Sequence, residues 1–299
     1  MLVIASRGSE LALWQAHSIE QRLSAAGLLS RIRVIKTTGD KITGVPLASV
    51  GTKGLFTKEI EEALLDGSAD LAVHSLKDLP TDLPPGLVLA GVPEREDARD
   101  AMVGRRLDEL PEGATVGTSS LRRAAQLRHL RPDLNVESVR GNLDTRLRKL
   151  DDGQYDAIVL AAAGLKRLGW TKRIAEMLSP EVMCPAVGQG ALALESLESG
   201  PGKDACAALD HSSTRAAVLA ERSLLGALGG GCQVPIGAHA IVENSRLRLS
   251  ALVAAPDGSE IVRAQSEGSI SDAASLGRSL GAELLGRGAR RILDSVYAG

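Results

Sequence analysis

One cysteine lies in a loop suited to exposing its sulfur. Cys232 follows the glycines Gly229, Gly230 and Gly231, and Pro235 comes three residues after it. Glycine lets the backbone approach a ligand closely, and proline fixes the way the chain leaves the turn. A thiol placed in this way can be a nucleophile or can carry a covalently bound group. A free cysteine after a helix is just as commonly a small core residue, so the loop alone leaves both interpretations open.

Cations and hydroxyl groups follow the ends of several predicted strands. Ligands of open parallel sheets bind outside the carboxyl ends of the strands, so we expect these side chains to line one cleft. Arg122 and Arg123 directly follow a serine helix cap, where the partial positive charge of the helix N-terminus disfavours a cation. A bound anion explains them, and several such positions predict a ligand with several carboxylates or phosphates. The other residues of this kind are Arg7, Ser9, Ser75, Lys77, Ser120, Arg140, Arg146, Lys166 and Arg167.

One acid stands among these bases. Asp78 lies in the run His74 to Pro80 and is flanked by Lys77. An ion pair with Lys77 or a helix cap is its simplest role. Its functional role is to stabilise positive charge that develops on a substrate inside a closed cleft. The chain has neither a Walker sequence nor a dinucleotide glycine fingerprint, so a ligand with several carboxylates is favoured over a nucleotide.

The composition is that of a soluble globular protein. Of 299 residues, 44% are hydrophobic and 24% charged, and this length predicts two or three domains. The three cysteines form no metal-binding spacing, which predicts a reducing compartment, the cytoplasm, and no metal. A net charge of −2 gives no general reason to bind nucleic acid. Neither a leader sequence nor an apolar stretch of membrane-spanning length is evident.

The order of predicted elements indicates an α/β protein. Strand, helix and strand follow one another from residue 2 to residue 36, which is the pattern of a parallel sheet covered by helices. A second α/β unit begins after the charged run 93–100, and the stretch 185–190 is expected to return the chain to the first. Two such lobes resemble the clamshell of periplasmic solute-binding proteins, with a cleft between them. The stretch 41–58 is predicted to be a lid.

Three domains are predicted from this order. The first α/β lobe comprises residues 1–93 and 190–211, and the second comprises residues 94–189. A small α+β domain, residues 212–299, follows and carries Cys232 at its edge. In it we expect a helix from Ser213 or Thr214, two strands around the turn 256–258, and one long helix over 272–293.

Seven stretches together make the chain resemble the porphobilinogen deaminase (hydroxymethylbilane synthase) family over essentially its whole length. Any one of them can recur by chance, but seven in order are highly specific. They are Ala5–Ser9 with Leu11–Ala16, Gly54–Glu59, Val73–Pro80, Gly117–Arg123, Arg140–Asn142, Pro185–Gly190 and Gly230–Gly237.

The resemblance implies a transferase of porphyrin, and hence heme, biosynthesis. Such an enzyme adds four porphobilinogen molecules head to tail to a dipyrromethane cofactor, losing ammonia at each step, and releases hydroxymethylbilane by hydrolysis. The resemblance places the cofactor on Cys232 through a thioether. Each pyrrole carries acetate and propionate arms, which match the predicted ligand with several carboxylates. It also implies a monomer with no nucleic-acid or membrane partner.

The resemblance assigns further roles by position. Asp78 corresponds to the catalytic carboxylate, which contacts pyrrole N–H groups and stabilises the azafulvene-like cation left after deamination. The cofactor-binding set is Cys232, Lys77, Ser120, Arg122, Arg123, Arg140, Arg146 and Gln189. The substrate-binding set is Arg7, Ser9, Arg140, Arg146 and Arg167. Lys53, Phe56 and Lys58 fall in the active-site loop, where Phe56 is placed to stack on a pyrrole ring.

Two departures from the family pattern and two competing functions remain. Leu197 stands where the family often has an arginine two residues after the acid Glu195, and Ala98 replaces a frequent proline.

An anion-binding or sensor module on the same clamshell explains the arginines but not Cys232 or Asp78. A hydrolase with Cys232 as nucleophile is disfavoured, because no adjacent histidine is evident to activate it.

Overall fold

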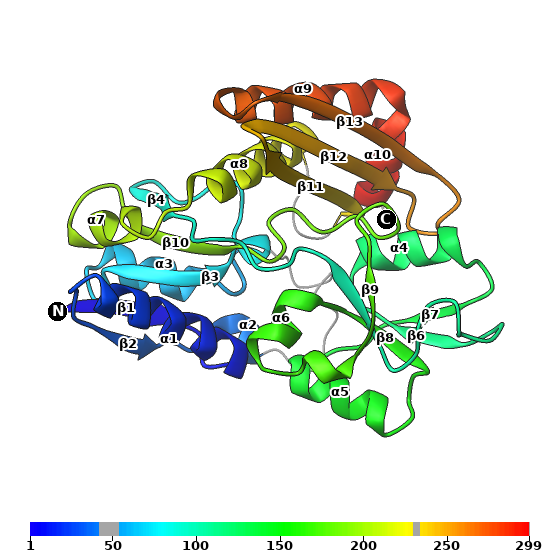
Figure 1. The fold of residues 1–299 in the computed structure, drawn as a ribbon, viewed down its shortest axis with the longest axis horizontal. Helices are drawn as coiled ribbons and strands as arrows, with labels where there is room; N and C mark the ends of the chain where they lie inside the picture. The colour runs from blue at the N-terminus through cyan, green and yellow to red at the C-terminus, as the bar shows by residue number, and fades with distance from the viewer. Residues whose placement is uncertain (42–53, 230–233, 299) are drawn as a thin grey trace. The chain divides into compact units, whose positions relative to one another are not determined.

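The computed structural model describes residues 1–41, 54–229 and 234–298 (Figure 1). The chain forms two compact units. The first comprises Met1–Glu96 and Ala191–Arg215, and the second comprises Asp97–Gly190 and Ala216–Gly299. The chain therefore passes from one unit to the other at residue 96, returns at residue 190, and leaves again within a helix at residue 215.

A five-stranded mixed sheet forms the centre of the first unit, in the order β2-β1-β3-β10-β4. Strand β1 is parallel to β2 and β3, whereas β10 is antiparallel to both β3 and β4. Strand β10 follows the return crossing, so a late segment of the chain joins two early strands. The strands are β1 (Leu2–Ser6), β2 (Ser30–Val34), β3 (Leu71–Ser75), β4 (Leu87–Gly91) and β10 (Leu192–Leu197).

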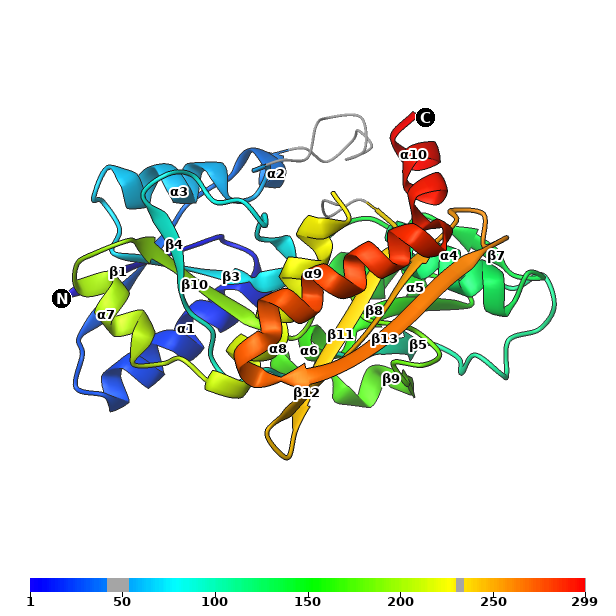
Figure 2. The ribbon, with the colours of Figure 1, turned by 90° about the horizontal axis from the view of Figure 1, so that it is seen from above.

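Helices cover both faces of this sheet, as Figures 1 and 2 show. Ile4 of β1 faces the core beneath α1 (Glu10–Ala25) and α7 (Pro201–Ala207). Its neighbour Ala5 faces the opposite core, beneath α3 (Lys58–Leu65). Successive side chains of a strand point to opposite faces, so this alternation of buried residues requires two layers of helix. The remaining helical turns are α2 (Thr38–Lys41) and the 3-10 turn η2 (Leu76–Asp78).

The second unit contains a similar sheet in the order β7-β6-β8-β5-β9. Strands β7, β6 and β8 are parallel, and β5 is antiparallel to β8 and β9. Helix α4 packs on one face through Leu127, and helices α5 and α6 pack on the other through Leu147 and Leu165. The elements are β5 (Asp100–Val103), β6 (Thr115–Gly117), α4 (Leu121–Leu130), β7 (Asn135–Glu137), α5 (Leu143–Asp151), β8 (Ala157–Ala161), α6 (Ala162–Arg167), η3 (Thr171–Arg173) and β9 (Ile174–Leu178).

A three-stranded antiparallel sheet, β11-β12-β13, completes the second unit. Helices α8, α9 and α10 pack on one face of it in a single apolar core. The other face places Leu252 and Ala254 against Ala125 of α4 and Cys184. The elements are α8 (Ser212–Ala227), β11 (Ile236–Glu243), β12 (Arg246–Ala254), β13 (Ile261–Ser269), η4 (Ile270–Asp272), α9 (Ala273–Leu284), η5 (Leu285–Ala289) and α10 (Arg290–Ala298).

The sheets confirm the predicted fold class, two α/β lobes with a small α+β part. The division into three domains stays a proposal, since the second lobe and the three-stranded sheet share one compact unit. Sequence periodicity missed strands β5, β9, β10 and β11 and helix α7. The prediction of one long C-terminal helix was wrong, because Gly288 at φ 110° separates α9 from α10.

Close helix packing yields a stability test. An added Cβ at buried Gly277 of α9 would lie 2.2 Å from the carbonyl oxygen of Ala220 in α8. We expect Gly277→Ala to lower the free energy of unfolding by about 1–3 kcal/mol, because helices must separate to admit it. Gly226→Ala is the matched control, since nothing lies within 4 Å of its added Cβ. Its stability should be unchanged or raised by up to about 1 kcal/mol. Urea unfolding measures both, and equal effects would contradict the packing.

Candidate active site

The Lys77–Asp78 pair lies just past the carboxyl end of β3. Leu76 and Leu79 are 1% and 3% exposed, and they anchor the 3-10 turn in the core of the first unit. The two residues between these anchors therefore face outward: Lys77 is half-buried and Asp78 is exposed. The pattern of apolar, basic, acidic and apolar residues thus presents a carboxylate and an ammonium side by side on a fixed turn.

Three further contacts hold the approach to this turn. His74 Nε2 lies 2.9 Å from Glu195 Oε2, and both side chains are buried. Gln15 of α1 donates to Ser75 Oγ at 2.9 Å. The backbone N–H of Leu76 donates to the carbonyl of Ala191 at 3.0 Å. The position of Asp78 is therefore fixed by contacts from α1, β10 and the start of the returning chain.

Arg7 meets an acid and an aromatic ring within the first unit. Its guanidinium forms an ion pair with Asp40 and lies 4.2 Å from the centre of the Phe56 ring. Thr37 Oγ1 also donates to Asp40, at 2.8 Å. Burial alone would raise the pKa of Asp40, but the hydrogen bonds from Arg7 and Thr37 outweigh it and lower that pKa below its ordinary value.

Phe56 fits beside Arg7 because residue 39 has no side chain. A Cβ at Gly39 would lie 2.2 Å from the Phe56 ring. The predicted stacking of Phe56 on a pyrrole stays a prediction, and its partner in the structure is the Arg7 guanidinium. Ser9 caps helix α1 by accepting from the Ala12 N–H, and Lys58 is exposed with Glu62 at 4.0 Å.

A buried acid binds both arginines at the start of α4. Asp100 is fully buried, with one carboxylate oxygen 2.7 Å from Arg122 Nη1 and the other 2.7 Å from Arg123 Nη2. The two arginines predict an anion at this helix N-terminus, and in the structure the Asp100 carboxylate is such an anion. Burial would raise the pKa of Asp100, but the two guanidinium groups lower it to about 2.

Gln189 and two carbonyl groups complete this cluster. Gln189 Nε2 donates to Asp100 Oδ1 at 2.9 Å and to the Ala98 carbonyl at 2.7 Å. Arg122 Nη1 also donates to the Cys184 carbonyl at 2.6 Å, while its buried Nε meets no partner among the described residues. The assignment of Arg122, Arg123 and Gln189 to cofactor binding stays a prediction. Their described contacts are with the protein.

Other predicted ligands of the second unit lie at strand ends. Ser120 follows β6 and caps α4, accepting from the Arg123 N–H at 3.4 Å. Arg140 follows β7, and Arg146 in α5 donates to the Gly141 carbonyl at 2.8 Å. Both arginines are half-buried, so each also faces solvent. Because β6 and β7 are parallel, these donors share one edge of the sheet, and their chemistry suits carboxylate arms.

Arg167 is more deeply placed than the other predicted substrate ligands. It is 9% exposed, and its Nη2 donates to the Gly190 carbonyl at 2.7 Å. Its described contact therefore fixes the backbone at the return crossing. Its role in substrate binding stays a prediction.

Some predicted residues fall outside the described part of the chain. They are Cys232, Lys53 and the loop residues 42–52. The other two cysteines are described, and both are free and buried. Burial raises the pKa of the Cys184 and Cys206 thiols to about 12, so neither forms a reactive thiolate near neutral pH.

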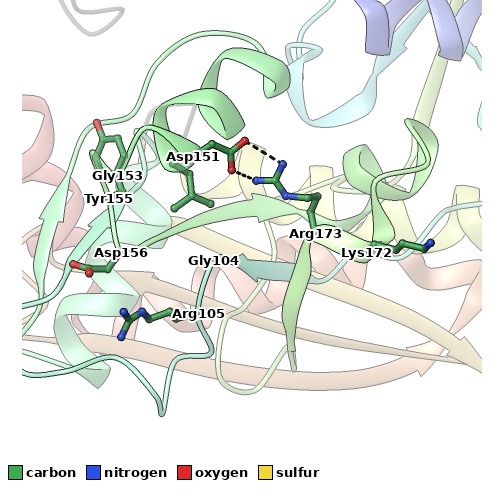
Figure 3. A pocket seen from close by; sticks show the side chains of 9 residues that line it. Gly104, Arg105, Asp151, Gly153, Tyr155, Asp156, Lys172 and Arg173 are labelled. Atoms are coloured by element: carbon green, nitrogen blue, oxygen red, sulfur yellow. Dashed lines mark hydrogen bonds and ion pairs between the residues drawn. The ribbon is translucent and has the colours of Figure 1, made fainter.

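The second unit also has an open hollow of about 520 Å³ away from all predicted site residues (Figure 3). Arg173 points to Asp151 and pairs with it, at 3.3 Å for one contact. Arg105 and Lys172 point in opposite directions, so these cations do not converge on one anion. The hollow is lined by Gly104, Arg105, Leu150, Asp151, Gly153, Tyr155, Asp156, Lys172 and Arg173.

Comparison with known families decides between the competing functions. Residues 2–201 match the dipyrromethane cofactor-binding domain of porphobilinogen deaminase, and residues 215–286 match its C-terminal domain. The chain belongs to the porphobilinogen deaminase family. This confirms the family, the dipyrromethane cofactor and the enzyme class predicted from the motifs.

Two curated porphobilinogen deaminases illustrate the similarity. The protein of Syntrophobacter fumaroxidans is 52% identical over 300 residues, which are 98% of this chain and 97% of the relative. That of Nitratidesulfovibrio vulgaris is 54% identical over 305 residues, 99% of this chain and 97% of the relative. The similarity to porphobilinogen deaminases therefore extends over both compact units.

Similar solved structures include periplasmic proteins. A substrate-binding protein of an ABC transporter from Coxiella burnetii matches 74% of this chain and 95% of its own, with 15% identity and a TM-score of 0.45. The methionine-binding protein MetQ matches 70% of this chain and 89% of its own, with 14% identity and a TM-score of 0.43. Within the described residues, no helix is long and apolar enough to cross a bilayer, and no group of acidic, histidine and cysteine side chains is arranged to hold a metal ion.

The buried Asp100 cluster gives a stability prediction with a defined pH dependence. Asp100→Asn leaves two buried guanidinium groups without their counter-charge, so it should lower the free energy of unfolding by about 3–5 kcal/mol at neutral pH. The native pKa of Asp100 is depressed to about 2, below its unfolded value. Its stabilisation is therefore present above pH 4 and lost as the pH falls towards 2.

Urea unfolding of both proteins across that range measures the difference. The difference in free energy of unfolding between wild type and Asp100→Asn should become smaller as the pH is lowered from 4 towards 2. Asp108→Asn is a matched control, since Asp108 is exposed and its contact with Arg106 is a surface pair. A gap that stays constant with pH would contradict the assigned pairing.

Proposed function

We propose that this protein deaminates porphobilinogen, joins four molecules head to tail on a dipyrromethane primer and releases hydroxymethylbilane by hydrolysis. The observation that carries the proposal is the match of both family domains along the chain, with Asp78 in its motif on an outward-facing turn. When bound, the cofactor supplies the pyrrole carbon to which the first substrate molecule is joined. A competing anion-binding module would leave the exposed carboxylate of Asp78 without a task.

Cys232 is the proposed attachment point of the cofactor. The chain has three cysteines, and two of them are buried thiols whose pKa is raised to about 12. Thioether formation needs a sulfur that can reach the electrophile and lose its proton. Cys184 and Cys206 meet neither condition, so elimination agrees with the motif that surrounds Cys232.

The residues proposed to bind the carboxylate arms differ in how many of their hydrogen-bond donors are already used within the protein. Lys77, Ser120, Arg140 and Arg146 are all half-buried near strand ends, which suits hydrogen bonding to acetate and propionate arms. Arg122 and Arg123 have most of their donors occupied by Asp100 and backbone carbonyls. Their proposed share in cofactor binding therefore rests on the remaining donors, among them the buried Nε of Arg122.

Asp78 is the proposed catalytic residue. Its carboxylate is exposed on a turn whose neighbours are buried, so it can approach a substrate without the turn rearranging. A fixed carboxylate accepts hydrogen bonds from pyrrole N–H groups and stabilises positive charge that develops on the substrate as ammonia leaves. Lys77 beside it is placed to hold a carboxylate arm of the ligand.

The cellular setting is also proposed. The substrate is porphobilinogen, the site is cytoplasmic and the enzyme acts as a monomer without nucleic-acid partners. The odd cysteine count and the two free, buried thiols agree with a reducing compartment.

The attachment point can be tested by mass. Intact wild-type protein should be heavier than its sequence by one dipyrromethane group, whereas Cys232→Ala should have the bare mass and no turnover, because no other thiol is reactive. Cys206→Ala is the matched control, since it removes a buried thiol and should keep the added mass. A bare mass in active wild type, or added mass on Cys232→Ala, would refute the assignment.

The catalytic role of Asp78 can be tested by turnover. Asp78→Asn removes the charge but keeps the shape, so porphobilinogen consumption should fall on the order of 100-fold while the cofactor mass is retained. Asp82→Asn changes an exposed acid four residues away and should leave turnover nearly unchanged. A colorimetric assay of porphobilinogen measures both. Near-normal turnover by Asp78→Asn would move the chemistry to another residue.

A further inference from the structure

A buried polar cluster lies directly behind the proposed catalytic turn. His74 of β3, Glu195 of β10 and Glu61 of α3 are 6%, 0% and 8% exposed. Neither the sequence motifs nor the proposed chemistry gives them a task. Acids and histidines are rarely placed in a core unless they are paired, because removing charge from water is costly. A cluster of three in the small core under α3 therefore requires an explanation.

The strand register brings the cluster together. In the antiparallel β3–β10 pair, His74 lies opposite Ala193 and Ala72 lies opposite Glu195. His74 and Glu195 are thus diagonal neighbours on one sheet face, the face on which Ala72 packs under α3. Their side chains meet at 2.9 Å between Nε2 and Oε2. A carboxylate only accepts hydrogen bonds, so the imidazole Nε2–H is the donor.

Glu61 covers this pair from the helix. Burial is the largest cause and raises the pKa of Glu61 above its ordinary value; the Thr57 side chain opposes this shift, and the Glu195 carboxylate adds to it. Glu195 Oε1 is buried and has no partner among the described residues, so it retains an unused acceptor. The charged groups around the cluster are Glu61 and Glu62 from α3, Glu195 from β10 and His74 from β3. The buried carboxylate of Glu195 is therefore stabilised mainly by its hydrogen bond with His74.

Through His74, the cluster lies close to the turn that carries Asp78 in the chain. His74 is the penultimate residue of β3, and only Ser75 separates it from the turn that ends at Asp78. Beyond it, the chain is held by the Gln15 contact to Ser75 and by the Leu76 N–H donated to Ala191. Among the described residues, the His74–Glu195 contact is thus the last side-chain hydrogen bond between β3 and β10 before the turn that carries Asp78.

We propose that His74 is a positioning residue for the reaction: bound to Glu195, it holds the carboxyl end of β3 so that the next turn presents Asp78 in one orientation. This inference rests on the proposed function, because it gives the turn its chemical task. Loss of the bond frees the strand end and displaces the carboxylate. A small misplacement of a reacting group has a large effect on rate, while substrate held elsewhere binds as before.

Three variants test the role by steady-state kinetics. His74→Leu removes the donor, and kcat should fall on the order of 10- to 100-fold with KM changed less than about threefold. His74→Gln places an amide N–H close to the position of Nε2, and it should restore kcat to within about threefold of wild type. Val73→Ala is the matched control, since Val73 precedes His74 but packs on the opposite sheet face. It should lower the melting temperature and leave kcat unchanged.

A double variant tests the role of His74 even if the single variant does not fold. His74→Leu alone leaves Glu195 buried without its donor, which can unfold the unit. His74→Leu with Glu195→Leu replaces the polar pair by apolar side chains, and it should fold, retain the cofactor mass and still lose kcat. Intact mass and melting temperature are recorded for every variant. They separate loss of position from loss of fold or of cofactor.

Each outcome bears on one claim. Normal kcat in His74→Leu or in the double variant overturns the inference, and so does a kcat loss that Val73→Ala shares or that His74→Gln fails to restore. These results leave the proposed function intact, because wild type still consumes porphobilinogen. If wild type consumes none, the proposed function fails, and the role of His74 fails with it.

Discussion

A fully buried carboxylate, that of Asp100, links the two ends of the α/β lobe in the second compact unit. Asp100 has lost all contact with water, and it is stabilised only because two guanidinium groups and an amide surround it. Burial lowers the pKa of Arg123, so that arginine in turn needs the acid. Asp100 opens β5 just after the chain enters the unit, and Gln189 is the penultimate residue before the chain leaves it. The interaction therefore joins the two ends of the lobe, and α4 is anchored to both.

A related arrangement occurs in the first unit. There the strand next to the crossing is β10, and its buried acid is Glu195, which is bound to His74 of β3. In both units, an antiparallel strand beside a crossing carries a buried acid that pairs with a nitrogen donor from another element. Asp100 contacts two arginines predicted to bind the cofactor, and Glu195 contacts His74, four residues before the predicted catalytic residue Asp78. Because a buried polar group that loses its partner is destabilised, each pair holds its two elements together.

The electrostatic requirement at the start of α4 was predicted from the sequence, but the protein's own anion, Asp100, was not. Two arginines at a helix N-terminus do need a negative charge, and the prediction placed a ligand there. Asp100 escaped notice because it belongs to a charged run that resembles a hinge, and nothing in one sequence shows that its last acid begins a buried strand. Asp40 escaped for a similar reason, since its partner Arg7 is distant in sequence. The pairing of Glu195 with His74 was not predicted either, because its strand β10 was missed.

The sequence by itself determined the family, the order of most elements in both lobes and the turn that presents Asp78, because these follow from local patterns and specific motifs. Helix caps, strand lengths and the alternation of Leu76 and Leu79 with polar residues are encoded within a few positions. Only the tertiary structure decided which charged groups face each other. Pairing of Asp100 with Arg122, or of Glu195 with His74, depends on strand order and register, and these bring together residues far apart in the chain. Burial then decides which arginines are occupied by the protein's own acids and which also face solvent.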